Sequence, residues 1–179
     1  MEAVLKSIKD WFLGKRDYFN AFAKADSRLE GWLKVELILL LPNLVKTGLL
    51  ENFERECRVT TPAGRKQVDF SLTARGELHY CELKAMCISQ AAGTPRDLKF
   101  YFRDDQVGLI KDFKKLDIIP SDNKWVLGLV YPNPGLSQWA DAVESLPDSL
   151  KHWQCRTRPD SFPEYLFVSV WKPKPTSNY

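Results

Sequence analysis

The segment that most constrains the fold of this chain is Lys66–Lys84, which reads KQVDFSLTARGELHYCELK. Apolar and polar residues alternate on both sides of Ala74–Glu77, a pattern typical of two antiparallel strands joined by a tight turn. Gly76 can supply the positive φ that such a turn requires. If Arg75 and Gly76 form the centre of the turn, the residue numbers of each facing pair add up to 151.

This register predicts a hairpin with one mostly apolar face and one charged face, because side chains of a strand alternate between its two sides. On the charged face, Asp69 lies opposite Glu82, and Lys84 follows on the same side. The pairs expected on the apolar face are Val68 with Leu83, Phe70 with Cys81, and Leu72 with His79.

The facing acids Asp69 and Glu82 predict a site that attracts a cation. Cβ atoms of opposed strand residues lie roughly 5 Å apart, so two carboxylates repel by about 3 kcal/mol at an effective dielectric of about 20. A divalent metal would offset this repulsion, and Lys84 would offset part of it. The simpler alternative is that these charges form only the solvent-exposed side of the hairpin. The combination of Asp69, Glu82 and Lys84 downstream of an acidic helix favours a functional site.

The composition indicates a soluble protein of a single domain, residues 1–179, with 44% hydrophobic and 27% charged residues. The net charge of +3 permits a nucleic-acid partner without requiring one. The longest apolar run, Leu37–Leu41, is far shorter than the ~20 residues that cross a bilayer, so no membrane partner is expected. The N-terminus mixes charged and apolar residues, unlike a signal peptide.

The cysteine and histidine content excludes several classes of site. The four cysteines form no C-x-x-C pair and have no histidine at zinc-ligand spacing, which favours a reduced, cytoplasmic location. Neither His79 nor His152 lies in a nucleophile motif, and no glycine-rich phosphate-binding loop is present.

Two helices are expected before the hairpin. Residues 3–13 form an amphipathic pattern ended by Gly14, and we expect this helix to pack on the core. A second helix begins at Asp26 or Ser27 and ends before Pro42, with Glu30 at a capping-box position. Its other acid, Glu36, lies at the edge of the apolar stripe, where it is either a site residue or a carboxylate at the rim of the core.

The remaining pattern completes a mixed α/β fold. A strand at 53–60 precedes the hairpin and makes a three-strand meander. After a polar connection at 89–96, we expect a long helix over 98–116 capped by Asp97, a buried strand at 125–131, a helix at 136–146 and a strand at 165–171. Residues 172–179 are expected to form a flexible tail.

One end of the long helix is basic. Arg96, Lys99 and Arg103, with Tyr101 between them, are either an ordinary solvated face or a contact for a phosphate backbone.

This order of elements and acids resembles the PD-(D/E)xK nuclease superfamily, whose members have the restriction-endonuclease-like fold. The matching residues are Glu36 on its helix, Asp69 after Val68, and Glu82-Leu83-Lys84 on the third strand. The segment Asp112–Leu116, DFKKL, is also similar to sequences at that place in some members. The likeness covers roughly residues 26–171, with Val68 where the name of the family has proline.

The resemblance implies a metal-dependent DNA endonuclease. Asp69, Glu82 and the carbonyl of Leu83 would bind Mg²⁺ or Mn²⁺, and Glu36 would bind a second ion or a water on the metal. Lys84 would orient the attacking water or stabilise charge on the phosphate. Family members often form homodimers. The alternative is a catalytically inactive module that binds nucleic acid or serves as a scaffold in a defence or repair assembly.

Overall fold

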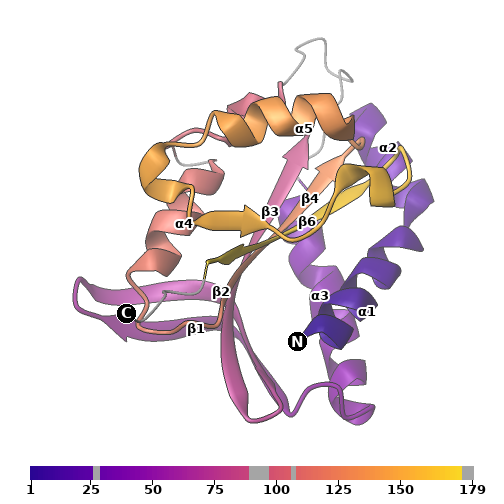
Figure 1. Ribbon diagram of the computed structural model, residues 1–179. Helices are drawn as coiled ribbons and strands as arrows, with labels where there is room; N and C mark the ends of the chain where they lie inside the picture. Colours follow the sequence, from indigo (N-terminus) through magenta and orange to yellow (C-terminus); the bar gives the residue numbers. More distant parts are fainter. Residues whose placement is uncertain (26–28, 89–96, 106–107, 175–179) are drawn as a thin grey trace.

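A six-stranded mixed sheet runs through the middle of the molecule in the order β1-β2-β3-β4-β6-β5 (Figure 1). The structure, a computed structural model, describes residues 1–25, 29–88, 97–105 and 108–174. Among the strands of these described ranges, β3 and β4 pair in parallel and the other neighbours pair antiparallel. The strands are β1 Asn52–Thr61, β2 Gly64–Ala74, β3 Glu77–Cys87, β4 Lys124–Tyr131, β5 Trp153–Cys155 and β6 Phe167–Pro173. The expected mixed α/β class is therefore confirmed.

Helices cover both faces of this sheet (Figure 1). One apolar core joins the first face to α1 Glu2–Leu13, α2 Arg16–Ala25 and α3 Glu30–Lys46. A second core joins the other face to α4 Leu109–Asp117 and α5 Gly135–Glu144. Short 3₁₀ helices, η1 Leu98–Tyr101, η2 Asp148–Leu150 and η3 Pro159–Ser161, lie in the connections. Among the helices of the described ranges, none has the length and apolar character needed to cross a membrane.

The predicted register of the hairpin is confirmed for residues 70–74 and 77–81, but the predicted pairs Asp69 with Glu82 and Val68 with Leu83 lie beyond the last paired residues. The pairs run from Ala74 with Glu77 to Phe70 with Cys81, and every pair adds up to 151. Both central residues of the turn have positive φ, 55° at Arg75 and 74° at Gly76.

The expected apolar face is wrong at one residue, because Val68 does not share a face with Phe70. Phe70 packs in the core with α1–α3, whereas Val68 packs with Met86 in the core on the opposite side. The alternation changes at Asp69, where the pairing of β1 with β2 also skips Glu56, a residue with φ of 54°. This local change of direction in β2 positions the candidate site described below.

Two predicted helix boundaries are wrong. The helix expected over 98–116 is divided into η1 and α4, with Gly108 as the N-cap of α4. Asp97 caps η1 instead, by accepting a hydrogen bond from the amide of Lys99. The second predicted helix does not end before Pro42, because α3 continues through it to Lys46. Burial of Leu41 and Leu44 on either side of the proline offsets the hydrogen bond that proline cannot make.

Other elements differ at their ends or were not predicted. Lys172 and Pro173 belong to β6, where they pair with β5, so the predicted tail begins too early. Residues 175–179, the predicted helix start at 26–28 and the connection at 89–96 lie outside the described residues. The sequence pattern gave no prediction of α2 or β5. The strand predicted at 125–131 is confirmed as β4, which lies between β3 and β6.

Gly128 on β4 is a position where one added methyl group should destabilise the sheet. A Cβ atom there would lie 2.4 Å from Ser169 Oγ and 2.6 Å from Met86 Cε, and both residues are buried. We expect Gly128→Ala to lower the free energy of unfolding by about 1–3 kcal/mol in urea titrations. Gly31→Ala is the control, since a Cβ there meets nothing within 4 Å and alanine favours the helix. Equal stability changes in the two variants would contradict this packing.

Candidate active site

The candidate site lies where β2 and β3 separate. Regular pairing between them ends at Phe70 and Cys81. One step further, the amide of Leu83 donates a hydrogen bond of 2.9 Å to Asp69 Oδ2. The Asp69 carboxylate therefore accepts the hydrogen bond that a backbone carbonyl of β2 would accept in a regular ladder. This bond fixes Asp69 beside the backbone of β3 at the point where the strands diverge.

Each of the two predicted acids contacts a lysine from a different helix. Lys34 Nζ on α3 lies 2.6 Å from Asp69 Oδ1, and Lys115 Nζ on α4 lies 2.6 Å from Glu82 Oε1. Asp69 is half-buried and Glu82 is only 2% exposed. The two helices thus approach the same pair of acids from opposite faces of the sheet.

Lys84 is the third lysine of the site and is also buried. Its Nζ lies 3.0 Å from Asp112 Oδ2 on α4 and 3.7 Å from Glu30 Oε2 at the start of α3. We call the whole set the carboxylate-lysine cluster: Glu30, Lys34, Asp69, Glu82, Lys84, Asp112 and Lys115. With four acids and three lysines, the cluster is nearly neutral when all its groups are charged.

The electrostatics of Glu82 favour its protonated form. Burial raises the pKa of this carboxyl to about 8, and the negative charge of Asp69 adds to the effect. Lys115 acts in the opposite direction but does not cancel it. The influence of Asp69 on Glu82 supports the expectation that the two acids lie close together.

The other buried groups of the cluster depend on their partners. Burial acts to lower the pKa of Lys84, but Asp112 and Glu30 outweigh it, so the pKa is raised and the ammonium stays charged. Burial raises the pKa of Asp112, an effect that Lys84 opposes. The pKa of Lys34 is raised in the same way: burial acts to lower it, but the carboxylate of Asp69 outweighs this effect.

Two buried oxygens of the cluster have charge partners but no well-aligned hydrogen bond. Glu82 Oε1 lies close to Lys115, and Asp112 Oδ2 lies close to Lys84, yet neither contact has hydrogen-bond geometry. Buried acceptors of this kind are ordinarily satisfied. They suit a hard cation such as Mg²⁺, which prefers oxygen ligands. Within the described ranges, however, no three acidic, histidine or cysteine side chains converge closely enough to hold a metal together.

Glu36 does not join the cluster. Its Oε2 accepts a hydrogen bond of 2.8 Å from the Trp11 indole and lies 3.0 Å from Lys15 Nζ. These contacts tie α3 to α1 and to the start of α2, which is the rim-of-core alternative raised by the sequence. The acid of α3 that does approach the site is Glu30, which had been explained only as a capping residue.

The basic residues predicted to contact nucleic acid are only partly described. Arg96 lies outside the described residues, while Lys99 and Arg103 are exposed. Arg103 lies over the ring of Phe100, 5.4 Å from its centroid. Tyr101 is buried and exchanges hydrogen bonds with the backbone of Cys87, so its ring is not available to a base.

The sequence interpretation left Glu30, Lys34, Asp112 and Lys115 out of the site. Their spacing carried a signal, because Glu30 and Lys34 lie four residues apart and Asp112 and Lys115 lie three apart. Such pairs share one face of a helix. Each helix therefore presents one acid and one lysine to the hairpin, α3 to Asp69 of β2 and Lys84 of β3, and α4 to Lys84 and Glu82 of β3.

Comparison of the chain with protein-family models, with curated proteins and with solved structures finds no match. The functional argument therefore depends on the geometry of the cluster.

Proposed function

We propose that this protein is a divalent-metal-dependent phosphodiesterase, a DNA endonuclease of the PD-(D/E)xK type with a restriction-endonuclease-like core. The observation that carries the proposal is the meeting of Asp69 and Glu82 at the divergence of β2 and β3, with Lys84 two residues further along β3. Two acids can hold a divalent ion, and a nearby lysine can stabilise the charge that develops when a phosphodiester is hydrolysed.

In this proposal Asp69 and Glu82 hold the cation, and the backbone of Leu83 lies beside them. Lys34 and Lys115 contact these carboxylates, and both ammonium groups would move aside when a cation binds. When bound, Mg²⁺ or Mn²⁺ would polarise the scissile phosphate and lower the pKa of the attacking water.

Lys84 would stabilise the charge that develops on the phosphate. Its ammonium is held by Asp112 and Glu30 in a buried position, so it needs little reorganisation during the reaction. Glu30 replaces Glu36 in this scheme as the acid that α3 contributes. DNA is the proposed partner, and a homodimer would allow both strands of a duplex to be cleaved.

The direct test is cleavage of supercoiled plasmid and of linear DNA with Mg²⁺ or Mn²⁺. We expect cleavage by the wild-type protein and its loss in Asp69→Asn. Glu36→Gln is the matched control, since its carboxylate contacts only Trp11 and Lys15 in the described structure, and it should retain activity. Cleavage that survives unchanged in Asp69→Asn would exclude this site.

A second candidate function is a catalytically inactive nuclease-fold module that binds nucleic acid or serves as a scaffold. The observation that favours it is that each acid of the cluster already has a lysine within 4 Å. In such a protein the network is complete without metal. Thermal melting separates the two functions, because a ligand at 100 times its Kd stabilises the folded state by about 2.7 kcal/mol. A scaffold should not respond to Mg²⁺.

The stabilisation by Mg²⁺ is expected to depend on pH. Glu82 must lose its proton to hold a cation, and its pKa is raised to about 8. The apparent affinity should therefore increase by up to about tenfold per pH unit as the pH rises from about 6 towards 8, and then level off. Melting curves with and without Mg²⁺ across this range measure the effect. A shift that stays constant over the range would contradict a role for Glu82 in holding the ion.

A further inference from the structure

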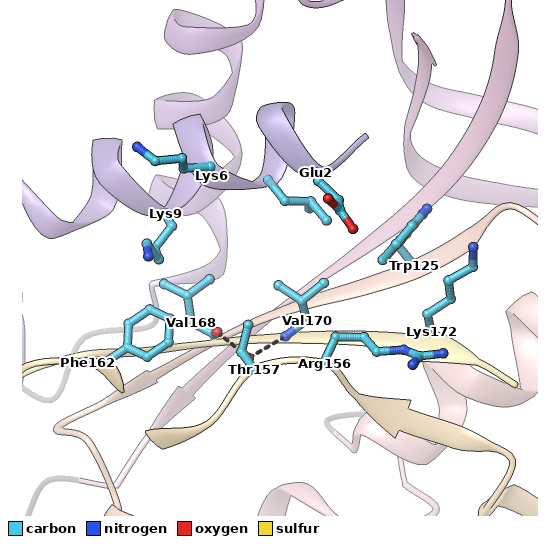
Figure 2. Close-up of a pocket in the computed structure, with 11 residues that line it drawn as sticks. Glu2, Lys6, Lys9, Trp125, Arg156, Thr157, Phe162, Val168, Val170 and Lys172 are labelled. Atoms are coloured by element: carbon cyan, nitrogen blue, oxygen red, sulfur yellow. Dashed lines mark hydrogen bonds between the residues drawn. The ribbon is translucent and has the colours of Figure 1, made fainter. Parts of the chain in front are cut away.

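A cavity of about 530 Å³ lies between α1 and the sheet (Figure 2). Residues of α1 form one side, and residues of β4, β6 and the segment after β5 form the other. None of the residues that line it belongs to the cluster. Its volume is within the range of about 300–1,000 Å³ that is typical of small-molecule sites.

The rim of this cavity carries more positive than negative charge. Lys9, Arg156 and Lys172 make no ion pair with an acid in the described part of the chain, whereas Lys6 is paired with Asp10 at 2.6 Å. Glu2 is the one acid among the lining residues. Three cations from three different segments, with no acidic partner among the described residues, favour a ligand that carries more than one negative charge.

The ammonium groups at the two ends lie over aromatic rings. Lys9 Nζ is 5.5 Å from the centroid of Phe162, and Lys172 Nζ is 4.9 Å from the centroid of Trp125. Such contacts hold a cation near a ring face without neutralising its charge. Both lysines are therefore positioned and still able to attract an anion.

The wall between the charged ends of the cavity is apolar, and hydrogen bonds hold the segment after β5 against β6. Val168 and Val170 of β6 face the cavity (Figure 2). Leu5 of α1 also lines it. Thr157 Oγ1 donates a hydrogen bond of 2.9 Å to the carbonyl of Val168 and accepts one of 3.2 Å from the amide of Val170. These bonds fix the segment that carries Arg156 against the sheet.

We propose that this cavity binds a nucleotide unit, with the phosphate at the end that carries Arg156 and Lys172 and the base against the apolar wall between that end and Lys9. A phosphate matches several cations, and a base has the flat apolar surface that such a wall can cover. A fatty acid fits less well, because it carries a single charge and the cavity opens to solvent. The source of the unit is either a free nucleotide or a single strand of nucleic acid. The proposal does not depend on DNA cleavage, since the two sites share no residue.

The test is a binding titration of the full chain in the presence of EDTA, which excludes the proposed metal site. The probes are a nucleoside 5′-monophosphate, a short single-stranded oligonucleotide, the nucleoside without phosphate, and inorganic phosphate. We expect the monophosphate to bind at least about tenfold more tightly than the nucleoside or inorganic phosphate. Tighter binding of the oligonucleotide than of the monophosphate would identify the strand as the source, and similar binding would identify the free nucleotide.

Variants at the rim make the test specific. Arg156→Gln combined with Lys172→Gln should weaken binding by at least about 30-fold, since each charged hydrogen bond contributes tenfold or more. Glu2→Gln should strengthen it a few-fold by removing a like charge. Lys46→Gln, an exposed change at the end of α3, is the control and should have no effect. The inference is overturned if the monophosphate and the oligonucleotide both fail to bind, if inorganic phosphate binds equally well, or if the control weakens binding as much.

Discussion

Replacing Lys84 by methionine is expected to lower the rate of metal-dependent DNA cleavage by about 10²–10³-fold, the usual cost of removing one group that stabilises developing charge. Methionine keeps the length and apolar stem of lysine but removes the ammonium. In the protein Lys84 is only 6% exposed, and its ammonium lies between Asp112 and Glu30. The loss should therefore fall on the catalytic step and not on binding of DNA.

A control is needed because Lys84→Met also leaves Asp112 buried without its partner. Breaking a buried pair from one side costs about 3–5 kcal/mol. The double variant Lys84→Met with Asp112→Asn removes the unpaired charge and should recover much of that stability. It should remain inactive in single-turnover cleavage assays. Recovery of both stability and cleavage would show that Lys84 has only a structural role.

Replacing Glu82 by glutamine is expected to change how stability depends on pH. The pKa of Glu82 is raised to about 8 in the folded protein, from an ordinary value of 4.5. Between pH 4.5 and pH 8, the folded protein therefore holds a proton that the unfolded chain has lost. Wild-type stability should therefore decrease as the pH rises from about 4.5 to about 8, and change little from this cause above it. Glutamine cannot titrate, so Glu82→Gln should remove this decrease.

The expected difference is large because each pKa unit corresponds to 1.36 kcal/mol. The difference in free energy of unfolding between Glu82→Gln and the wild type should shift in favour of the variant by on the order of 4 kcal/mol between pH 5 and pH 9. Urea unfolding at a series of pH values measures it. Glu144→Gln, an exposed change on α5, is the control and should follow the wild-type curve. Parallel curves for wild type and Glu82→Gln would show that Glu82 is not held in a buried, proton-binding environment.

The parts of the site that the sequence predicted depend on local geometry. The turn at Arg75 and Gly76 sets the register of β2 and β3 as far as Phe70 and Cys81. Just beyond these pairs, the Asp69 carboxylate accepts a hydrogen bond from the amide of Leu83. The order of helices and strands also followed from periodicity, because β4 is apolar from Trp125 to Tyr131 and α1 buries one stripe. Both features are determined by residues close together in the chain.

The rotation of α3 could not be predicted in the same way. This helix has apolar residues on nearly all sides, and Val35 and Leu39 are exposed while Leu33 and Leu37 are buried. An apolar stripe therefore does not define which acid of α3 faces β3. The pattern indicates Glu36, whereas Glu30 is the acid that lies 3.7 Å from Lys84 Nζ. Packing against α1, through Trp11, decides the outcome.

Two further differences have the same origin in tertiary structure. The change of face at Asp69 depends on β1, where the pairing skips Glu56, and no feature of β2 alone signals it. The lysines that neutralise the acids, Lys34 and Lys115, come from helices far from the hairpin in sequence. Their positions follow from how α3 and α4 pack on opposite faces of the sheet, which periodicity alone does not give.

The most direct test of the central claim is a Mn²⁺ titration followed by electron paramagnetic resonance at pH 8.5, where Glu82 is mostly ionised. We expect wild-type protein to bind Mn²⁺, with binding lost in Asp69→Asn and in Glu82→Gln and retained in Glu36→Gln. Binding of equal strength in the wild type and in both site variants, or none in the wild type, would contradict the claim that Asp69 and Glu82 share a divalent cation.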